Sequence, residues 1–473
     1  MTALERAARE IYAAALAACD PAAALGACIV AKPGEVEVSG RPIPLDGFDD
    51  IRVLAVGKAA DPMLAAFSAA LDAAGVADTS RRGVAVAHEP GPSSVEWAAR
   101  MTGGHPIPDA RSLGAGRAAL DLFTDCTTHT LAVFLLSGGG SSLLEWPLDE
   151  RLAAGELATL NEALVRSDLP IRSINAIRKR LSAIKGGRLA LRAAPALQLT
   201  LVVSDVAPGD IGSVASGPTI ADDTTAEEVA EAVAKVRLAD RLPAPLAARV
   251  ATALARASET PALDAGELEH VRSIVEVVLD GESVLRAVER EARRHAALVV
   301  SLGSADGPLD RVVDEHLVAL ERLVSEAPAG DAVAVVSTGE VTLEVVGDGR
   351  GGRNQHSVLA AIVRAPELCP SVAELAVLSC GTDGRDGPTD AAGAVGTLET
   401  LARAEPLGLS ARDHLARFDA YTFFDTLGAL VRTGATQTNV RDVRVFIASV
   451  PDPLARARGS DEVQSARSRS RFR

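Results

Sequence analysis

A buried strand that ends in three glycines constrains the fold of this chain more than any other stretch. The apolar run Leu131–Leu136 is followed directly by Ser137-Gly-Gly-Gly-Ser-Ser142. An uninterrupted apolar run is typical of a strand covered on both faces, as in a parallel sheet. The glycines allow a sharp turn that exposes backbone N–H groups, a common way to bind phosphate. We therefore predict an α/β fold in which this loop, at the carboxyl end of a central strand, forms one wall of the active site. A tight turn without a ligand is the alternative.

Two known motifs do not describe this loop. No Gly-Lys-Ser/Thr follows at the spacing of a Walker A motif. A nucleophile elbow around Ser141 would need glycine at Leu143. The loop is therefore interpreted from its backbone chemistry alone.

Length, charge and cysteine use limit the class of protein. A chain of 473 residues favours two domains over one. The net charge of -15 argues against general nucleic-acid binding, so an anionic substrate needs a local basic cluster. The 5 cysteines are scattered without CxxC spacing, as expected for reduced thiols in a cytoplasmic protein. No uncharged apolar run approaches the roughly 20 residues of a membrane span, and we expect no membrane association.

Three basic residues are candidates for binding an anion. Lys58 follows the predicted strand 51–56 and precedes a predicted helix, where a lysine can reach an anion. Arg178 and Lys185 lie at helical spacing in the basic segment 173–192. The alternatives are a surface lysine and a solvated helix face.

Two aspartates follow predicted strands and are candidate metal ligands. Asp205 comes directly after the strand 199–203, and Asp383 lies in a loop of alternating glycine and aspartate after the strand 375–378. Carboxylates at the carboxyl ends of strands are plausible Mg²⁺ ligands. His105, in a loop with two prolines, is either a proton carrier or a structural hydrogen-bonding histidine.

Several loops together resemble one family, the ATP-dependent glycerate 2-kinases with an N-terminal kinase domain and a C-terminal domain named MOFRL. They occur in the expected order between about residues 50 and 448. The segments are Val56-Gly-Lys-Ala59, Gly104-His-Pro-Ile-Pro-Asp109, Leu136-Ser-Gly-Gly-Gly-Ser-Ser142, the basic stretch from Asn175 to Leu189, Ser204-Asp-Val206, Ala215-Ser-Gly-Pro-Thr219, Gly349-Arg-Gly-Gly-Arg-Asn-Gln355, Gly381-Thr-Asp-Gly384, Asp386-Gly-Pro-Thr-Asp-Ala-Ala-Gly393 and Thr438-Asn-Val440.

The resemblance implies a fold and a reaction. It implies two α/β domains with the active site in the cleft between them: a Rossmann-like three-layer α/β/α sandwich, placed at residues 1–265, and a MOFRL-containing α/β domain, placed at 266–449. Residues 450–473 are predicted to be a disordered tail. The implied reaction transfers a phosphoryl group from ATP to the 2-hydroxyl of D-glycerate and gives 2-phosphoglycerate. Kinases of other small hydroxy acids stay open, as does a homo-oligomeric assembly.

The resemblance also carries two catalytic residues onto this sequence, Lys58 and Arg353. By physical argument, Mg²⁺ would lie between ATP oxygens and the carboxylates of Asp205 and Asp383. The predicted contacts to nucleotide or substrate phosphate are Ser137, Gly138, Gly139, Gly140, Ser141, Ser142, Arg178 and Lys185.

A nicotinamide-dependent hydroxypyruvate reductase is the rival interpretation. It rests on the GxGxxG spacing of Gly347, Gly349 and Gly352, with a predicted strand before it and a predicted helix after it. Against it, Arg350 and Arg353 crowd the turn where the pyrophosphate would approach. The preceding strand also has the pattern of a hairpin half rather than of a βαβ unit.

Overall fold

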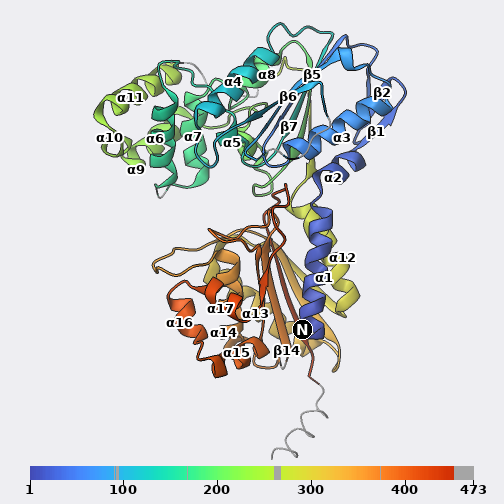
Figure 1. The fold of residues 1–473 in the computed structure, drawn as a ribbon, viewed down its shortest axis with the longest axis vertical. Coiled ribbons are helices and arrows are strands. Elements are labelled where there is room, and N and C mark those ends of the chain that lie inside the picture. The colour runs from blue at the N-terminus through green and yellow to red at the C-terminus, as the bar shows by residue number, and fades with distance from the viewer. Residues whose placement is uncertain (90, 92–94, 168, 260–267, 373, 452–473) are drawn as a thin grey trace, which may run out of the picture. The chain divides into compact units, whose positions relative to one another are not determined.

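The chain forms two compact α/β units, as predicted (Figure 1). The computed structural model describes residues 1–451 apart from 90, 92–94, 168, 260–267 and 373. The N-terminal unit consists of Asp20–Asp280 together with Gln437–Asn439. The C-terminal unit consists of Met1–Cys19, Gly281–Thr436 and the chain from Val440 onward.

The N-terminal unit is built on a parallel six-stranded sheet. In spatial order the strands are β6 (Ala98–Thr102), β5 (Arg81–Ala87), β4 (Asp50–Val56), β7 (Thr130–Leu136), β8 (Leu197–Val203) and β9 (Ser273–Leu279). The chain winds outward from β4 to one edge and then from β7 to the other, which is the doubly wound order of a Rossmann fold. The direction of winding changes between β4 and β7, and ligands bind beyond the carboxyl ends of the strands at such a point.

Helices cover both faces of this sheet. Leu54 of β4 and Phe134 of β7 pack in one apolar cluster with α4 (Ala110–Leu122) and α8 (Arg188–Ala193). Neighbouring strand residues point to the opposite face, where α3 (Ala60–Ala73) lies against β4, β5 and β7 (Figure 1). The N-terminal unit is therefore a three-layer sandwich.

Two smaller parts complete the N-terminal unit. One is a helical cluster with its own apolar core, made of α6 (Ala154–Val165), α7 (Ile171–Leu181), α9 (Ala226–Val236), α10 (Leu238–Arg241) and α11 (Ala244–Glu259). The other is a small antiparallel sheet of β1 (Ile29–Lys32), β2 (Glu35–Val38) and β3 (Arg41–Pro44), next to α2 (Pro21–Cys28) and α3. The short elements α5 (Gly140–Leu143), η1 (Asp78–Ser80) and η2 (Ile211–Ser216), the last two being 3-10 helices, lie in loops of this unit.

The C-terminal unit contains a mixed six-stranded sheet. Its spatial order is β10 (Leu298–Ser304), β12 (Ala332–Gly339), β17 (Asp442–Ser449), β14 (Glu374–Gly381), β15 (Gly393–Thr397) and β16 (Leu430–Val431). β12 and β14 both run antiparallel to β17. The carboxyl ends of β12 and β14 therefore lie side by side at the same end of the strands as Asp442, the first residue of β17.

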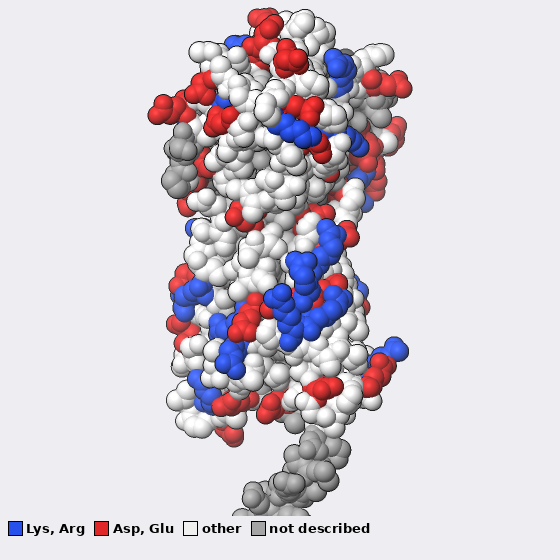
Figure 2. Space-filling view, turned by 90° about the vertical axis from the view of Figure 1, so that its right-hand side faces the viewer, with Lys and Arg blue, Asp and Glu red and all other residues white. Residues whose placement is uncertain are grey.

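Helices pack on this second sheet. Those that contact its strands are α1 (Ala3–Ala18), α12 (Gly281–His295), α13 (Leu309–Glu326), α14 (Arg353–Leu368), α15 (Leu398–Ala404) and α17 (Ala420–Thr426). The 3-10 helix η3 (Glu405–Leu407) packs on α15, and α16 (Ala411–Ala416) packs on α14 and α17. α12 buries Val284, Leu285 and Val288 and turns arginines such as Arg286 and Arg293 outward. Figure 2 views the side of the molecule that lies to the right in Figure 1, where α12 is labelled, and shows basic side chains gathered there among acidic ones. Arg286 and Arg293 pair with glutamates one helical turn earlier, as is usual on a solvated helix face.

The units divide the chain differently from the predicted domains 1–265 and 266–449. β9 pairs with β8, so the N-terminal unit extends past the predicted boundary. α1 packs against α12 and β14, and the Tyr12 hydroxyl donates to the Gly381 carbonyl oxygen at 2.7 Å, so the first helix belongs to the C-terminal unit. The sequence of an amphipathic helix does not say which of two sheets it covers. Of the predicted tail, 452–473 lies outside the described residues.

Three elements differ from what the sequence pattern predicts. The pattern of residues 1–30 predicts one helix, but the helix breaks at Asp20, whose carboxylate caps α2 by accepting from two backbone N–H groups. The pattern of 341–346 predicts a hairpin partner for the preceding strand, whereas the structure has β13 (Val341–Thr342), paired in parallel with β11 (Gly307–Pro308). The pattern of 422–431 predicts a helix, but α17 ends at Thr426 and Leu430–Val431 form β16 against β15.

Among the described helices, none is by itself long and apolar enough to cross a membrane; only α1 and α2 taken together meet that length and composition.

The core of the C-terminal unit contains a histidine that we expect to make it sensitive to acid. The ring of His316 lies between the Val312 carbonyl (2.6 Å) and the Ser337 hydroxyl (2.8 Å) and is fully buried. Burial lowers the pKa of His316 from 6.5 to about 4, and the nearby Arg444 guanidinium acts in the same direction. The stabilisation from neutral His316 is complete above pH 6.5. It is lost as the pH falls toward 4, because the unfolded chain then binds a proton that the folded one excludes.

We therefore expect the free energy of unfolding to fall by roughly 3 kcal/mol between pH 7 and pH 4 through this residue. Thermal unfolding from pH 7.5 to 4.5 measures it, with His316→Gln expected to flatten the profile. His129→Gln, at an exposed histidine, serves as the control. An equally steep profile in His316→Gln would assign the acid sensitivity to other groups.

Candidate active site

The loops after β4 and β7 are joined directly at the point where the winding direction changes. The backbone N–H of Lys58 donates to the Gly138 carbonyl at 2.9 Å. The Ser137 hydroxyl accepts from the N–H of Ala59 (3.0 Å) and donates to the carbonyl of Val56 (3.1 Å). Ser137 is 1% exposed. Its hydroxyl therefore holds the two loops together. The sequence predicted that Ser137 contacts phosphate, whereas the contacts seen in the structure are to the protein backbone.

The side chains of Lys58 and His105 both lie next to Gly139. Gly139 has φ +84°, which a residue with a side chain rarely adopts. A Cβ atom at this position would lie 3.2 Å from Cδ2 of His105 and 3.8 Å from Cγ of Lys58. Both side chains therefore pack over the bare backbone of Gly139, and His88 is near, with its ring 5.9 Å from that of His105.

The glycine loop carries backbone donors that the protein does not use. Within the described part of the chain, the N–H groups of Gly138, Gly139 and Ser141 donate to no protein acceptor. Gly139 and Ser141 are also partly exposed. Successive N–H groups in a turn with a left-handed residue form a concave anion site. This backbone can therefore bind a phosphate or a carboxylate.

Asp205 lies against the same loop from the end of β8. A Cβ atom on Gly138 would be 2.0 Å from Oδ2 of Asp205, so the carboxylate packs on the glycine backbone. The same oxygen accepts from Nδ2 of Asn439 at 3.3 Å. Lys58, Asp205 and the glycine loop thus gather at one end of one sheet, as the sequence predicted for them.

The last two serines of the loop make different contacts, and Ser141 is linked to η2. The Ser141 and Ser216 hydroxyls are 2.8 Å apart, and Ser216 donates to Oδ1 of Asn175 at 3.3 Å. The Ser142 hydroxyl donates to the Gly139 carbonyl at 3.2 Å. Ala215 and Ser216 both have positive φ values, 50° and 60°, an unfavourable conformation that the surrounding contacts must hold.

The basic segment 173–192 is not one helix, because α7 ends at Leu181 and α8 begins at Arg188, so Lys185 lies between them. Lys185 is 1% exposed, and its ammonium pairs with the buried carboxylate of Glu145. Burial lowers the pKa of Lys185. Arg178 donates from Nε to Oδ1 of Asn161 at 2.7 Å, and burial lowers its pKa as well. The ammonium of Lys185 is neutralised inside the protein, so this contact is evidence against a phosphate-binding role for it.

We expect Lys185→Met to reduce stability rather than substrate binding. Removing the lysine leaves Glu145 buried without a charged partner, which costs about 3–5 kcal/mol of unfolding free energy. Urea denaturation measures this cost, and Lys235→Met is the matched control, because Lys235 forms an exposed pair with Glu231. Unchanged stability together with a raised KM for ATP would restore the phosphate-binding interpretation.

In the C-terminal unit, Arg353 is the first residue of α14 and is held by two carboxylates. Its Nε and Nη2 atoms donate to Asp442 at 2.7 and 3.2 Å, and Nη2 lies 2.9 Å from Oε1 of Glu340. Burial disfavours its charge, but Asp442 and Glu340 outweigh burial and raise the pKa of Arg353. Burial also raises the pKa of Glu340, against the opposing effect of Arg353.

The loop after β14 contributes two aspartates with different surroundings. Asp383 is partly exposed and accepts from the N–H of Arg385 at 3.0 Å. Asp386 is buried and accepts from the N–H groups of Asn354 (3.0 Å) and Gln355 (2.8 Å), so it fixes the start of α14. Burial raises the pKa of Asp386 to about 7, while these two N–H groups act in the opposite direction.

No cluster of three or more His, Cys, Asp or Glu side chains able to hold a metal ion occurs among the described residues. Mg²⁺ is usually held by one or two carboxylates together with substrate phosphates. Asp205 in the N-terminal unit and Asp383 in the C-terminal unit are each a partly exposed carboxylate.

The glycines of the GxGxxG spacing pack against protein. Cβ atoms on Gly347 and Gly349 would each lie 2.4 Å from the Arg417 carbonyl oxygen, and one on Gly352 would lie 2.2 Å from Oδ1 of Asp386. The loop also follows β13, which is not a strand of the large sheet. The spacing is therefore accounted for by packing within the C-terminal unit.

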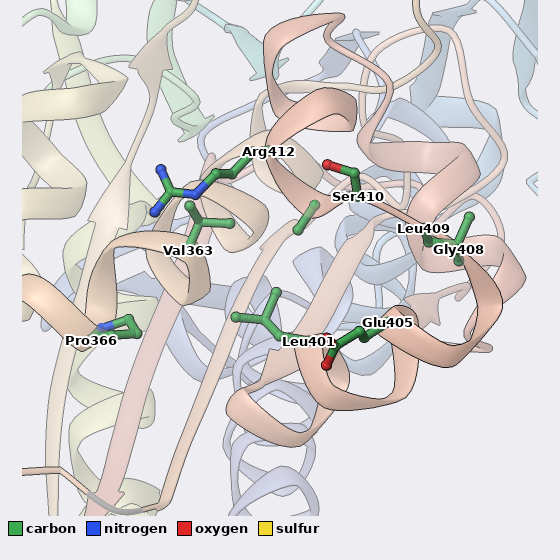
Figure 3. A pocket seen from close by; sticks show the side chains of 9 residues that line it. Val363, Pro366, Leu401, Glu405, Gly408, Leu409, Ser410 and Arg412 are labelled. Carbon is green, nitrogen blue, oxygen red and sulfur yellow. The ribbon is translucent and has the colours of Figure 1, made fainter.

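Two surface pockets lie apart from these loops. One of about 480 Å³ is surrounded by α14, α15 and α16, with Val363, Leu401 and Arg412 on its walls (Figure 3). Another of about 590 Å³ is lined by Arg117, Trp146 and residues of α8. Neither is lined by Lys58 or Arg353.

The sequence analysis assigned no role to three residues that contact predicted site residues. Asp442 begins the last strand, and Asn439 entered only through the Thr438-Asn-Val440 segment of the family resemblance, without a role of its own. Glu340 follows β12 as Asp205 follows β8. The same rule, an acidic residue beyond the carboxyl end of a buried strand, would have selected Glu340.

Comparisons with known proteins agree with this architecture. Residues 7–251 match a family described as "Domain of unknown function (DUF4147)", and residues 333–442 match the MOFRL family. Among solved structures, a glycerate kinase from Thermotoga maritima superposes with a TM-score of 0.76 at 28% sequence identity, covering 94% of this chain and 99% of that one.

Two relatives carry different names. A "D-glycerate 2-kinase" from Thermotoga maritima is 32% identical over 408 residues, covering 85% of this chain and 91% of the relative. A "Putative hydroxypyruvate reductase" from Agrobacterium vitis is 33% identical over 446 residues, covering 93% of both. Sequence similarity therefore indicates an enzyme acting on a small molecule and leaves two reaction classes to compare.

Proposed function

The chain belongs to the glycerate kinase family with a MOFRL region, and from this we propose that it transfers the γ-phosphoryl group of ATP to the 2-hydroxyl of D-glycerate. The products are ADP and 2-phospho-D-glycerate. The kinase names of the Thermotoga maritima relatives support this reaction class.

One observation carries the proposal: unused backbone N–H groups lie beside Lys58 where the winding direction of the sheet changes. Phosphoryl transfer needs positioning and positive charge more than covalent chemistry. In our proposal the Gly138–Ser142 backbone binds a phosphate or the substrate carboxylate. Lys58 neutralises charge that develops on the transferred group, and Arg353 of the C-terminal unit contributes a second positive charge to it.

Mg²⁺ is the proposed cofactor, with Asp205 and Asp383 as its protein ligands. When bound, the ion neutralises charge on the phosphate oxygens. Asp205 is suited to this role because its carboxylate is already held against the glycine loop by Asn439.

Hydroxypyruvate reduction is the second candidate, favoured by the name of the Agrobacterium vitis relative. Its support in the sequence is the glycine spacing at 347–352. Protein atoms occupy the space beside those glycines, which weighs against a dinucleotide there. We therefore place this activity second.

The test is an assay of the purified protein with ATP, Mg²⁺ and D-glycerate. ADP formation is followed, and the product is passed to enolase, which accepts 2-phosphoglycerate but not the 3-isomer. ADP with an enolase-competent product supports the kinase and its regiochemistry. Absence of ADP, with NAD(P)H consumed on hydroxypyruvate, would replace the proposal by the reductase.

A further inference from the structure

The guanidinium of Arg353 has one edge engaged by protein and one nitrogen left over. Nε and Nη2 donate to Asp442, and Nη2 also lies 2.9 Å from Oε1 of Glu340. Within the described residues, Nη1 makes no hydrogen bond. The side chain is 35% exposed. Arg353 can therefore offer Nη1 to an anion without leaving Asp442.

Asp442 is fixed in place by the sheet. As the first residue of β17 it lies in register between Gly339 of β12 and Gly381 of β14. Its side chain is only 2% exposed. A bidentate carboxylate on a central strand holds a guanidinium in one plane, because both hydrogen bonds must be kept at once. Asp442 therefore determines where Arg353 points.

Glu340 is held less firmly. It lies beyond the end of β12, and its side chain is 34% exposed. It makes a single contact with the guanidinium, to the same nitrogen that Asp442 uses. A carboxylate at this position competes with an incoming phosphate for the guanidinium, because both are anions.

We propose that Asp442 is a positioning residue that orients Arg353, and that Glu340 is a competing carboxylate that an anionic substrate displaces from it. This inference rests on the proposed role of Arg353 in phosphoryl transfer. The two carboxylates touch the same side chain, yet they act in opposite directions: Asp442 promotes use of Arg353 and Glu340 restrains it.

The experiment compares Asp442→Asn, Glu340→Gln and the wild-type protein by steady-state kinetics and by calorimetric titration with ATP in excess Mg²⁺. We expect Asp442→Asn to lower kcat about 10- to 100-fold, because the guanidinium loses its orientation. Glu340→Gln should tighten ATP binding by about threefold, because a competing charge is removed. Asp314→Asn is the matched control, since Arg364 of the same helix is likewise held by two carboxylates.

Each outcome decides one statement. If kcat falls equally in Asp442→Asn and Asp314→Asn, Asp442 has only a structural role. If Glu340→Gln binds ATP more weakly than the wild-type protein, Glu340 does not compete with the substrate. If Asp442→Asn does not fold, the direction of the Glu340→Gln effect decides alone. A wild-type protein that binds ATP but does not phosphorylate glycerate would sink the proposed function, and the ATP titrations would still test the inference.

Discussion

Replacing Lys58 with alanine lowers kcat by about 10²- to 10³-fold, the effect of removing one preorganised charge from a transition state. The stem of Lys58 packs over Gly139 beside the unused N–H groups, so its charge is held where a phosphoryl group would bind. Its backbone N–H is tied to the Gly138 carbonyl, so the truncation leaves the loop in place. Stopped-time ADP assays on the variant measure the loss.

Lys32→Ala is the control for general effects of losing a lysine. Lys32 pairs with Glu35 and Glu37 on the small antiparallel sheet, and its side chain is 51% exposed. We expect its kcat to match the wild-type value. Near-normal turnover in Lys58→Ala would remove Lys58 from the mechanism.

The second large effect is expected for Gly138→Ala. The added Cβ would lie 2.0 Å from Oδ2 of Asp205, so this carboxylate must move. A side-chain terminus can rotate away more cheaply than backbone, and we expect the variant to stay folded while kcat falls about 10²-fold from the misplaced group. If Asp205 binds Mg²⁺, the Mg²⁺ concentration needed for half-maximal rate rises as well.

Gly155→Ala provides the matched glycine control. Gly155 lies in the first turn of α6, and a Cβ atom added there would have no other atom within 4 Å. The change should therefore be neutral or stabilising by up to about 1 kcal/mol. Thermal unfolding of both variants separates stability from activity. Unchanged kcat and Mg²⁺ dependence in Gly138→Ala would show that the position of Asp205 is unimportant.

The loops at the point of reversed winding could be predicted because their signals are local. An apolar run followed by glycines identifies β7 and its loop, and the apolar run before Lys58 identifies β4. The strands β6 and β15 could not be predicted, because this local signal is absent from both. β6 is half exposed and β15 contains glycines, so neither shows an apolar run.

Whether a basic residue is available to bind an anion depends on ion-pair partners that lie far away in the sequence. Lys185 and Arg353 both look like anion-binding residues beside glycines. Lys185 meets Glu145, which is 40 residues away, inside the core. Arg353 meets Asp442, which is 89 residues away, at the first residue of the central strand β17, and its own side chain stays 35% exposed. Residue type alone cannot separate these two outcomes, because burial of the pair depends on the tertiary fold.

The assignment of α1 to the C-terminal unit has a consequence for biosynthesis. The ribosome makes this helix before residues 20–280, but the strands and helices that bury its apolar face are translated only from Gly281 onward. Leu4, Ile11 and Tyr12 are therefore synthesised well before the residues that bury them. While residues 20–280 are made, the nascent chain thus offers the apolar face of α1 to chaperones.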